Sequence, residues 1–140
     1  MRLTVIQQGR LRDAQVTALC AEYRKRFQRF GTLTVLEIEP KGDTPLWPKS
    51  ARWKVALDER GPFPTSIGFS QLLQKWTMAH GEVAFAIGDA MTLHPPTRAT
   101  ADATLGLSAM TLPHQLAHLL LIEQIYRAAT ITAGTGYHHA

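Results

Sequence analysis

The feature that most limits the possible folds is an alternation of strand-like and helix-like segments along the whole chain. Residues 83–88, with the sequence VAFAIG, form a continuously apolar run, which is typical of a strand covered on both faces. Other runs rich in β-branched and apolar residues occupy positions 3–6, 33–39, 53–58 and 104–108. Because helical patterns separate these runs, we predict an α/β fold with a mostly parallel sheet and helices on both of its faces.

The first helical pattern, at 12–30, has one apolar face and one basic face. Arg24 and Arg26 lie on the basic face. That face is either a solvated helix surface or a contact with RNA phosphates.

Two further helices and one long connection follow. Ser66 can cap a helix that ends near Gly81, and a weaker helix rich in Ala and Thr follows the prolines at 95–96. The polar, proline-rich stretch 40–52 has neither the helical nor the strand period, so we expect a mobile loop there.

The chain of 140 residues has room for one core, and no linker or internal repeat divides it, so residues 1–140 are predicted to form a single domain. The net charge of +4 and the pI near 9.6 admit anionic partners without requiring them.

The single Cys20 excludes an intramolecular disulfide and a multi-cysteine zinc site. With no signal peptide or membrane-spanning run in sight, we expect a cytoplasmic protein without a membrane partner.

The usual motifs of several enzyme classes are missing. No GxxxxGK[ST] occurs and no GxGxxG follows the first strand, which weakens the case for nucleotide-triphosphate or ordinary dinucleotide binding. GxSxG and HExxH are also absent, so neither a hydrolase nucleophile nor a zinc protease is indicated. His114 and His118 share one helix face, but the sequence fixes no third ligand, and we expect no metal site.

Three strand ends are candidates for a ligand site, because parallel sheets bind ligands beyond the carboxyl ends of their strands. They lie at 57–61, 87–89 and 107–113. Residues 108–112 combine main-chain N–H and C=O groups with small or apolar side chains. This stretch either reads a flat heterocycle through its backbone or is an ordinary connection between a strand and a helix.

The last helical segment begins at Pro113 and has two apolar arcs. The first arc contains His118, Leu121, Ile122, Ile125 and Ala129. The second contains Leu116 and Leu120, beside Glu123 and Arg127, which can pair at positions i and i+4. The helix is therefore either the central core helix of a monomer or a helix that packs on its own sheet and on a two-fold partner.

The C-terminal third resembles a known family. The segment LSAMTLPHQLAHLLLIEQIYRA, from Leu107 to Ala128, and the closing GYHH resemble the ribosomal RNA large-subunit methyltransferase H family of the SPOUT class. AEYRKRF, VLEIEP, ALDERG and FAIG follow the family's order, so the resemblance covers nearly the whole chain. It implies a SPOUT methyltransferase fold with a C-terminal trefoil knot.

The resemblance also implies an activity. A homodimer would transfer the methyl group of S-adenosyl-L-methionine to N3 of a pseudouridine in large-subunit (23S) ribosomal RNA, so the ribosome or its RNA would be a partner. Tyr137 and His138 would lie at the cofactor pocket near the partner protomer and act in catalysis, His138 as a base or as a cation that stabilises the imide anion. The implied cofactor-binding residues are Leu57, Gly88, Leu107, Ser108, Ala109, Met110, Thr111 and Leu112.

Three positions depart from the family pattern. Asp89 stands where a second glycine is usual, His118 where arginine is usual, and His139 where arginine or lysine is usual. The candidate RNA-binding residues are His118, His139, Arg24 and Arg26. The departures leave three alternatives open: an active pseudouridine methyltransferase, a methyltransferase with shifted RNA specificity, and a cofactor-binding or ribosome-binding dimer without turnover.

Overall fold

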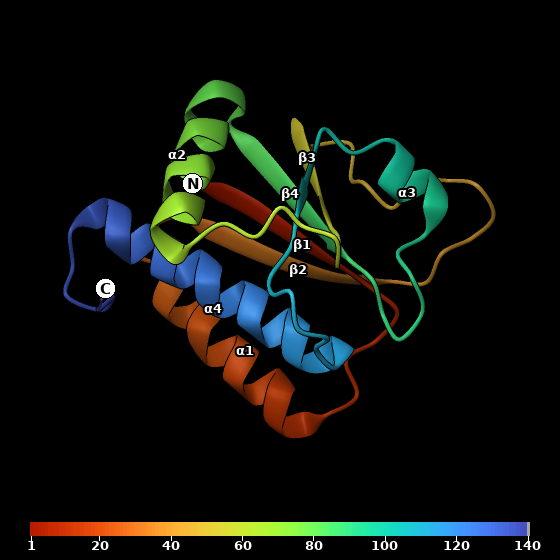
Figure 1. The fold of residues 1–140 in the computed structure, drawn as a ribbon, viewed down its shortest axis with the longest axis horizontal. Coiled ribbons are helices and arrows are strands. Elements are labelled where there is room, and N and C mark those ends of the chain that lie inside the picture. Colours follow the sequence, from red (N-terminus) through yellow and green to blue (C-terminus); the bar gives the residue numbers. More distant parts are fainter. Residues whose placement is uncertain (140) are drawn as a thin grey trace.

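The computed structural model describes residues 1–139 (Figure 1). Strands and helices alternate along the chain, as the sequence predicted. The elements are β1 (Arg2–Gln8), α1 (Ala14–Phe27), β2 (Thr32–Ile38), β3 (Trp53–Leu57), α2 (Ser66–His80), β4 (Glu82–Ile87), α3 (Pro95–Ala99), β5 (Ala103–Leu105) and α4 (His114–Ala133).

The five strands form one parallel sheet in the order β2-β1-β4-β3-β5, which confirms the predicted mostly parallel sheet. Because all strands run in one direction, their carboxyl ends lie at the same edge of the sheet. Figure 1 shows α3 beside this edge and the C-terminus at the opposite end of the molecule.

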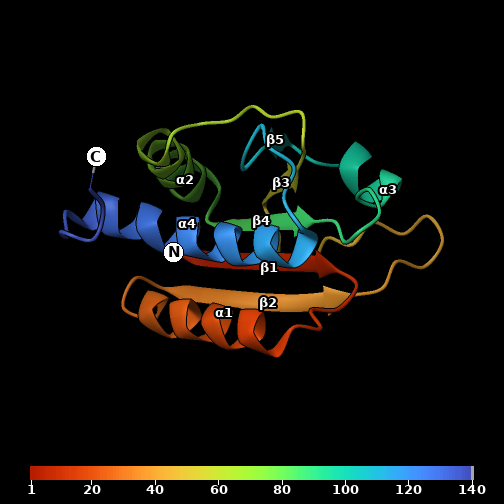
Figure 2. The same ribbon diagram turned by 60° about the horizontal axis from the view of Figure 1, so that its bottom comes forward.

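Side chains alternate between the two faces of the sheet along each strand. The layers that cover these faces differ in thickness. On one face, Leu3, Val5 and Phe85 pack with apolar side chains of α1, α2 and α4. On the other face, Ala84 and Ala86 leave space for a thin layer, which consists of the 40–52 connection and the segment around the one-turn helix α3. Figure 2 shows α1 and α4 lying along the sheet, with α3 at its far end.

The 40–52 connection is packed on the sheet, so the prediction of a mobile loop is wrong. Leu46 is buried against the sheet, and its N–H donates to Thr97 Oγ1 at 2.9 Å. Trp47 Nε1 donates to the Thr97 carbonyl at 3.1 Å, and His94 Nε2 lies 2.7 Å from the Gly42 carbonyl oxygen. The proline-rich composition does not reveal this packing, because Leu46 and Trp47 find their partners far away in the sequence.

The start of α2 also differs in detail from the prediction. Thr65 is the N-cap, and its hydroxyl accepts from the N–H of Gly68 at 3.0 Å. Ser66 instead donates from Oγ to Gln124 Oε1 at 2.8 Å, which ties the first turn of α2 to α4.

His118 lies in the buried arc of α4, as the helical spacing predicted, and its side chain is fully enclosed. Its Nδ1 lies 2.8 Å from Gln7 Oε1. The amide nitrogen of Gln7 donates to main-chain carbonyls, so its Oε1 accepts and Nδ1 of His118 carries the hydrogen. Burial lowers the pKa of His118 to about 4. The prediction that His118 contacts RNA is therefore wrong, because RNA cannot reach an enclosed, neutral imidazole.

The low pKa of His118 predicts that stability falls in mild acid. In the unfolded chain this histidine binds a proton near pH 6.5, but in the folded protein only near pH 4. Between these values the unfolded state binds more protons, so the free energy of unfolding decreases as the pH falls through this window and is unaffected by His118 above it. The full decrease is of the order of 3 kcal/mol.

Denaturant unfolding of the wild type and of His118→Asn measures this effect at about pH 4.5 and about pH 7.5. Asparagine keeps a donor for Gln7 and has no group that titrates in this range. The variant should lose less stability than the wild type on acidification. An identical loss in both proteins would contradict the assignment to His118.

Candidate functional site

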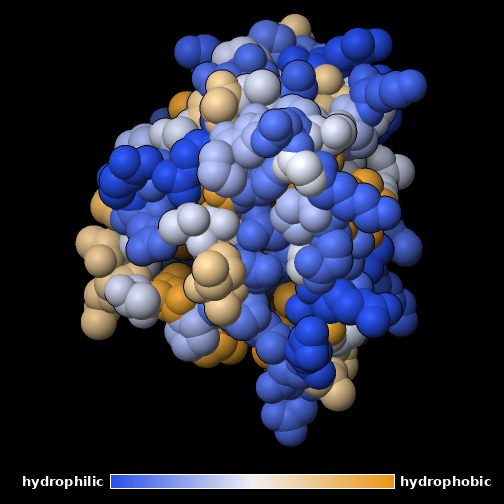
Figure 3. Space-filling model, turned by 90° about the vertical axis from the view of Figure 1, so that its right-hand side faces the viewer, coloured by the Kyte–Doolittle hydropathy of each residue, from blue (hydrophilic) through white to orange (hydrophobic). Residues whose placement is uncertain are grey.

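The carboxyl ends of β3, β4 and β5 surround one cavity of about 510 Å³. Leu57, Gly88 and all of residues 107–112 line it, so the structure brings together residues from three separate parts of the sequence. The volume falls in the range of small-molecule sites, roughly 300–1,000 Å³. Figure 3, which faces the α3 end of the molecule, shows a mainly hydrophilic surface with small apolar patches.

The loop 107–112 presents its main chain rather than polar side chains. Ser108 Oγ accepts from the N–H of Met110 at 2.9 Å, which holds a tight turn. Among the described residues, no backbone-to-backbone hydrogen bond involves this loop. Its remaining N–H and C=O groups are therefore available to a ligand, as reading a flat heterocycle through the backbone requires.

Gly88 is needed for close packing of the backbone at the end of β4. A Cβ atom at this position would lie 3.0 Å from the main-chain nitrogen of Leu93 and 3.2 Å from the carbonyl oxygen of Met91. Neither Gly88 nor Asp89 has a positive φ, so the backbone itself does not require glycine at position 89.

Two adjacent glutamines at the end of β1, Gln7 and Gln8, hold the loop 88–94 that follows β4. The sequence analysis identified neither of them. Gln8 Nε2 donates to Asp89 Oδ1 and to the Thr92 carbonyl, each at 3.2 Å, and Gln8 Oε1 accepts from the N–H of His94 at 2.7 Å. Gln7 Nε2 donates to the carbonyl of Gly88 at 3.4 Å. The sequence does show two amide side chains at the end of a strand. No sequence pattern, however, predicts which groups they form hydrogen bonds with.

At the end of β3, the largely enclosed carboxylate of Asp58 pairs with two arginines. Asp58 Oδ2 lies 3.0 Å from Arg60 Nη2 and 3.6 Å from Arg98 Nη1. Hydrogen bonds from the Arg60 side chain hold the pKa of Asp58 below its usual range. Both Asp58 and Arg98 line the cavity, so this pair joins β3 to α3 across its wall.

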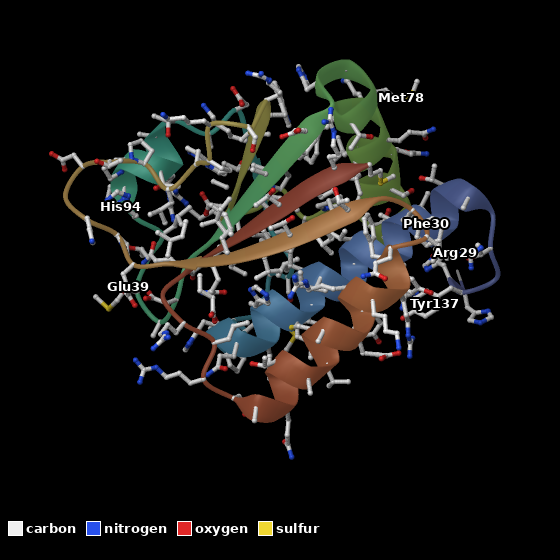
Figure 4. The ribbon with its side chains drawn as sticks, turned by 180° about the vertical axis from the view of Figure 1, so that it is seen from behind. Arg29, Phe30, Glu39, Met78, His94 and Tyr137 are labelled. Carbon is white, nitrogen blue, oxygen red and sulfur yellow. The ribbon has the colours of Figure 1, made fainter. Side chains whose placement is uncertain are left out.

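Tyr137 and His138 do not line the cavity of their own chain. Tyr137 donates from its hydroxyl to Glu123 Oε1 at 3.0 Å, and Arg127 Nη1 lies 3.0 Å from His138 Nδ1. The predicted pair of Glu123 and Arg127 is confirmed at 2.7 Å. Figure 4 shows Tyr137 at the end of the molecule opposite His94, the last residue of the loop 88–94. The structure therefore separates the predicted catalytic pair from the predicted cofactor residues of the same chain.

The contacts of the tail fix the state of two side chains. Arginine only donates, so His138 Nδ1 accepts and the hydrogen of the neutral ring is on Nε2. Burial raises the pKa of the Tyr137 phenol above its usual range, so the hydroxyl stays protonated and can donate to Glu123.

The other predicted RNA-binding residues differ in exposure: Arg26 and His139 are exposed, whereas Arg24 is half-buried. Arg26 pairs with Glu22 at 3.1 Å, which neutralises part of the basic face of α1. Arg24 remains a prediction, as does the exposed His139. Within residues 1–139, no cluster of three metal-ligating side chains occurs, and no helix has the length and apolar character needed to span a membrane.

Comparisons with known proteins agree with this geometry. The family model described as predicted SPOUT methyltransferase matches residues 1–138. Proteins named ribosomal RNA large subunit methyltransferase H are 39% identical in Rhodopseudomonas palustris, with 100% of both chains aligned, and 36% identical in an Anaeromyxobacter species, with 99% of each chain aligned.

A solved structure supports the fold alone. The SpoU methyltransferase AviRb from Streptomyces viridochromogenes superimposes with a TM-score of 0.53 at 13% identity, over 96% of this chain and 61% of that one. From the parallel sheet, the cavity at its carboxyl edge and the full-length relatives, we conclude that the chain belongs to the SPOUT methyltransferase family, among the relatives named ribosomal RNA large subunit methyltransferase H.

Proposed function

We propose that this methyltransferase moves the methyl group of S-adenosyl-L-methionine to N3 of a pseudouridine in large-subunit (23S) ribosomal RNA, in the cytoplasm. The observation that carries the proposal is the convergence of Leu57, Gly88 and residues 107–112 on one cavity. The names of the full-length relatives support a large-subunit ribosomal RNA substrate. The choice of cofactor and of the N3 atom rests on the resemblance of the C-terminal segment.

The residues of the cavity fit this cofactor. The main chain of 107–112 can recognise the edge of an adenine ring, and Leu57 and Leu105 offer apolar surface beside it. When bound, S-adenosyl-L-methionine supplies a methyl group on a positively charged sulfur, which becomes a neutral thioether on transfer. The chain itself has to orient both reactants in line, and it needs no covalent intermediate.

A second copy of the chain is part of the proposal. Leu19 of α1 and Leu116 and Leu120 of α4 are 39% to 49% exposed, although α1 and α4 are neighbours that share a core. A second copy of the chain can bury apolar side chains that two neighbouring helices leave exposed. A two-fold partner would cover them and would bring its Tyr137 and His138 to the cavity that they do not reach in their own chain. The C-terminal trefoil knot of the resembling family belongs to the same proposal.

In this arrangement His138 acts as a hydrogen-bond donor. Arg127 occupies Nδ1, so the ring offers Nε2–H to an oxygen of the target base. The N3–H group of pseudouridine lies between two carbonyls, and a donor to one of these oxygens stabilises the anion that forms when the N3 proton leaves to water. N3, held in this state, would accept the methyl group that a bound cofactor supplies, with the bond to sulfur breaking as the bond to nitrogen forms.

Cofactor binding gives the first test. At about a hundredfold excess over its Kd, S-adenosyl-L-methionine should stabilise the folded protein by about 2.7 kcal/mol, which a rise in melting temperature reports. Ribosomes that lack the modification, incubated with enzyme and cofactor, should then gain one methyl group on a large-subunit pseudouridine, as measured by mass mapping of the RNA.

Each other outcome of this test selects an alternative. No stabilisation at millimolar cofactor would reject the proposal. Methylation of another nucleotide would establish the shifted RNA specificity, and binding without any methylation would establish a dimer without turnover.

Variants of His138 test the role of the tail. His138→Ala should lower the methylation rate about a hundredfold, the effect expected for removal of one donor to a developing oxyanion, with little change in melting temperature. His138→Gln places an amide N–H near the position of Nε2 and should recover part of the rate. Equal loss in both variants would favour a general base instead, and full activity in both would remove the tail from catalysis.

A further inference from the structure

Asp89 is a carboxylate in the cavity wall without an ionic partner. The acidic residues that line the cavity are Asp58, Glu59 and Asp89. Asp58 is paired with Arg60 and Arg98, and Glu59, which has no ion pair among the described residues, is exposed to solvent. Within residues 1–139, no basic nitrogen lies within the 4.0 Å limit of an ion pair from an Asp89 oxygen. Asp89 therefore gives the wall a negative charge that the protein does not cancel.

Neutral donors hold this carboxylate in place. Asp89 Oδ1 accepts from Gln8 Nε2 at 3.2 Å and from the N–H of Met91 at 2.9 Å. Gln8 is buried and is fixed in turn by the N–H of His94 at 2.7 Å. These contacts orient the side chain and leave its full charge in place. The cavity wall thus contains a fixed charge on a half-buried side chain, where water screens it less than at an open surface.

The backbone does not explain why aspartate is present. With no positive φ at this position, glycine, asparagine and aspartate all fit the loop. The consequence of Asp89 must therefore lie in its side chain and its charge.

We propose that Asp89 is a specificity-determining residue, which makes the cavity prefer the sulfonium form of the cofactor, S-adenosyl-L-methionine, over the neutral thioether product, S-adenosylhomocysteine. The inference rests on the proposed function. The two ligands share the adenosine, the ammonium and the carboxylate groups, and they differ in the methyl group and the positive charge on sulfur. A negative charge in the wall attracts this extra positive charge, and the attraction disappears when the methyl group has been transferred.

This preference has a defined kinetic consequence. The attraction acts on the bound reactant and weakens as the charge leaves the sulfur, so it lowers the KM for the cofactor without raising kcat for the methyl transfer step. It also favours exchange of product for fresh cofactor, because the product lacks the charge that Asp89 attracts.

Titration calorimetry of both ligands tests the proposal. Asp89→Asn removes the charge and keeps an oxygen that can accept from Gln8 and Met91. We expect the Kd of S-adenosyl-L-methionine to rise about tenfold and that of S-adenosylhomocysteine to change less than about twofold. Asp89→Gly is a second neutral variant with the same expected result, and it serves if the first does not fold. Asp43→Asn, an acidic residue outside the cavity lining, controls for net charge.

The ratio of the two Kd values decides the outcome. A rise in the Kd of S-adenosyl-L-methionine relative to that of S-adenosylhomocysteine in the Asp89 variants, with no such rise in Asp43→Asn, supports the proposal, as does a raised KM with unreduced kcat. Equal weakening of both ligands places the effect on a group they share and overturns it, and so does no change in either. If the wild type binds neither ligand, the proposed function itself has failed, which is distinct from failure of the Asp89 assignment.

Discussion

Hydrogen bonds from two adjacent glutamines at the end of β1 connect the candidate site to the core. Strand geometry sends neighbouring side chains to opposite faces, so Gln7 bonds to His118 of α4 while Gln8 bonds to the 88–94 loop. Both amides are buried and must satisfy their polar groups inside the protein. The end of one strand therefore fixes the helix on one face and the cavity loop at the edge, and the position of Gly88 depends on both.

The charges of the cavity follow a division between paired and unpaired groups. Asp58 serves the architecture, because Arg98 ties the end of β3 to α3 and, together with Arg60, offsets the charge of the carboxylate. Asp89 has neutral donors only, so its charge is available to a ligand. Under the proposed function, in which the ligand is a cation that becomes neutral, this difference separates a structural carboxylate from one that would act on the ligand.

A single chain has a cofactor-sized cavity and a polar C-terminal cluster at opposite ends of α4. A continuous series of hydrogen bonds runs from the first turn of α2 to the tail, through Ser66, Gln124, Glu123, Arg127 and His138. This series orients His138 before any substrate is present. The proposed two-fold partner would cover the exposed leucines of α1 and α4 and would bring its C-terminal cluster to the cavity.

The sequence by itself determined the parallel α/β sheet, the three strand ends that form the cavity, and the buried arc of α4 with His118 in it. These features follow from local periodicity and from the direction of strands, which neighbouring residues decide. Only the tertiary structure decided that the 40–52 connection packs on the sheet, that Gln7 and Gln8 hold the site, that Asp89 is unpaired, and that the tail lies away from its own cavity. Each of these depends on contacts between residues far apart in the chain, whose pairing no local pattern encodes.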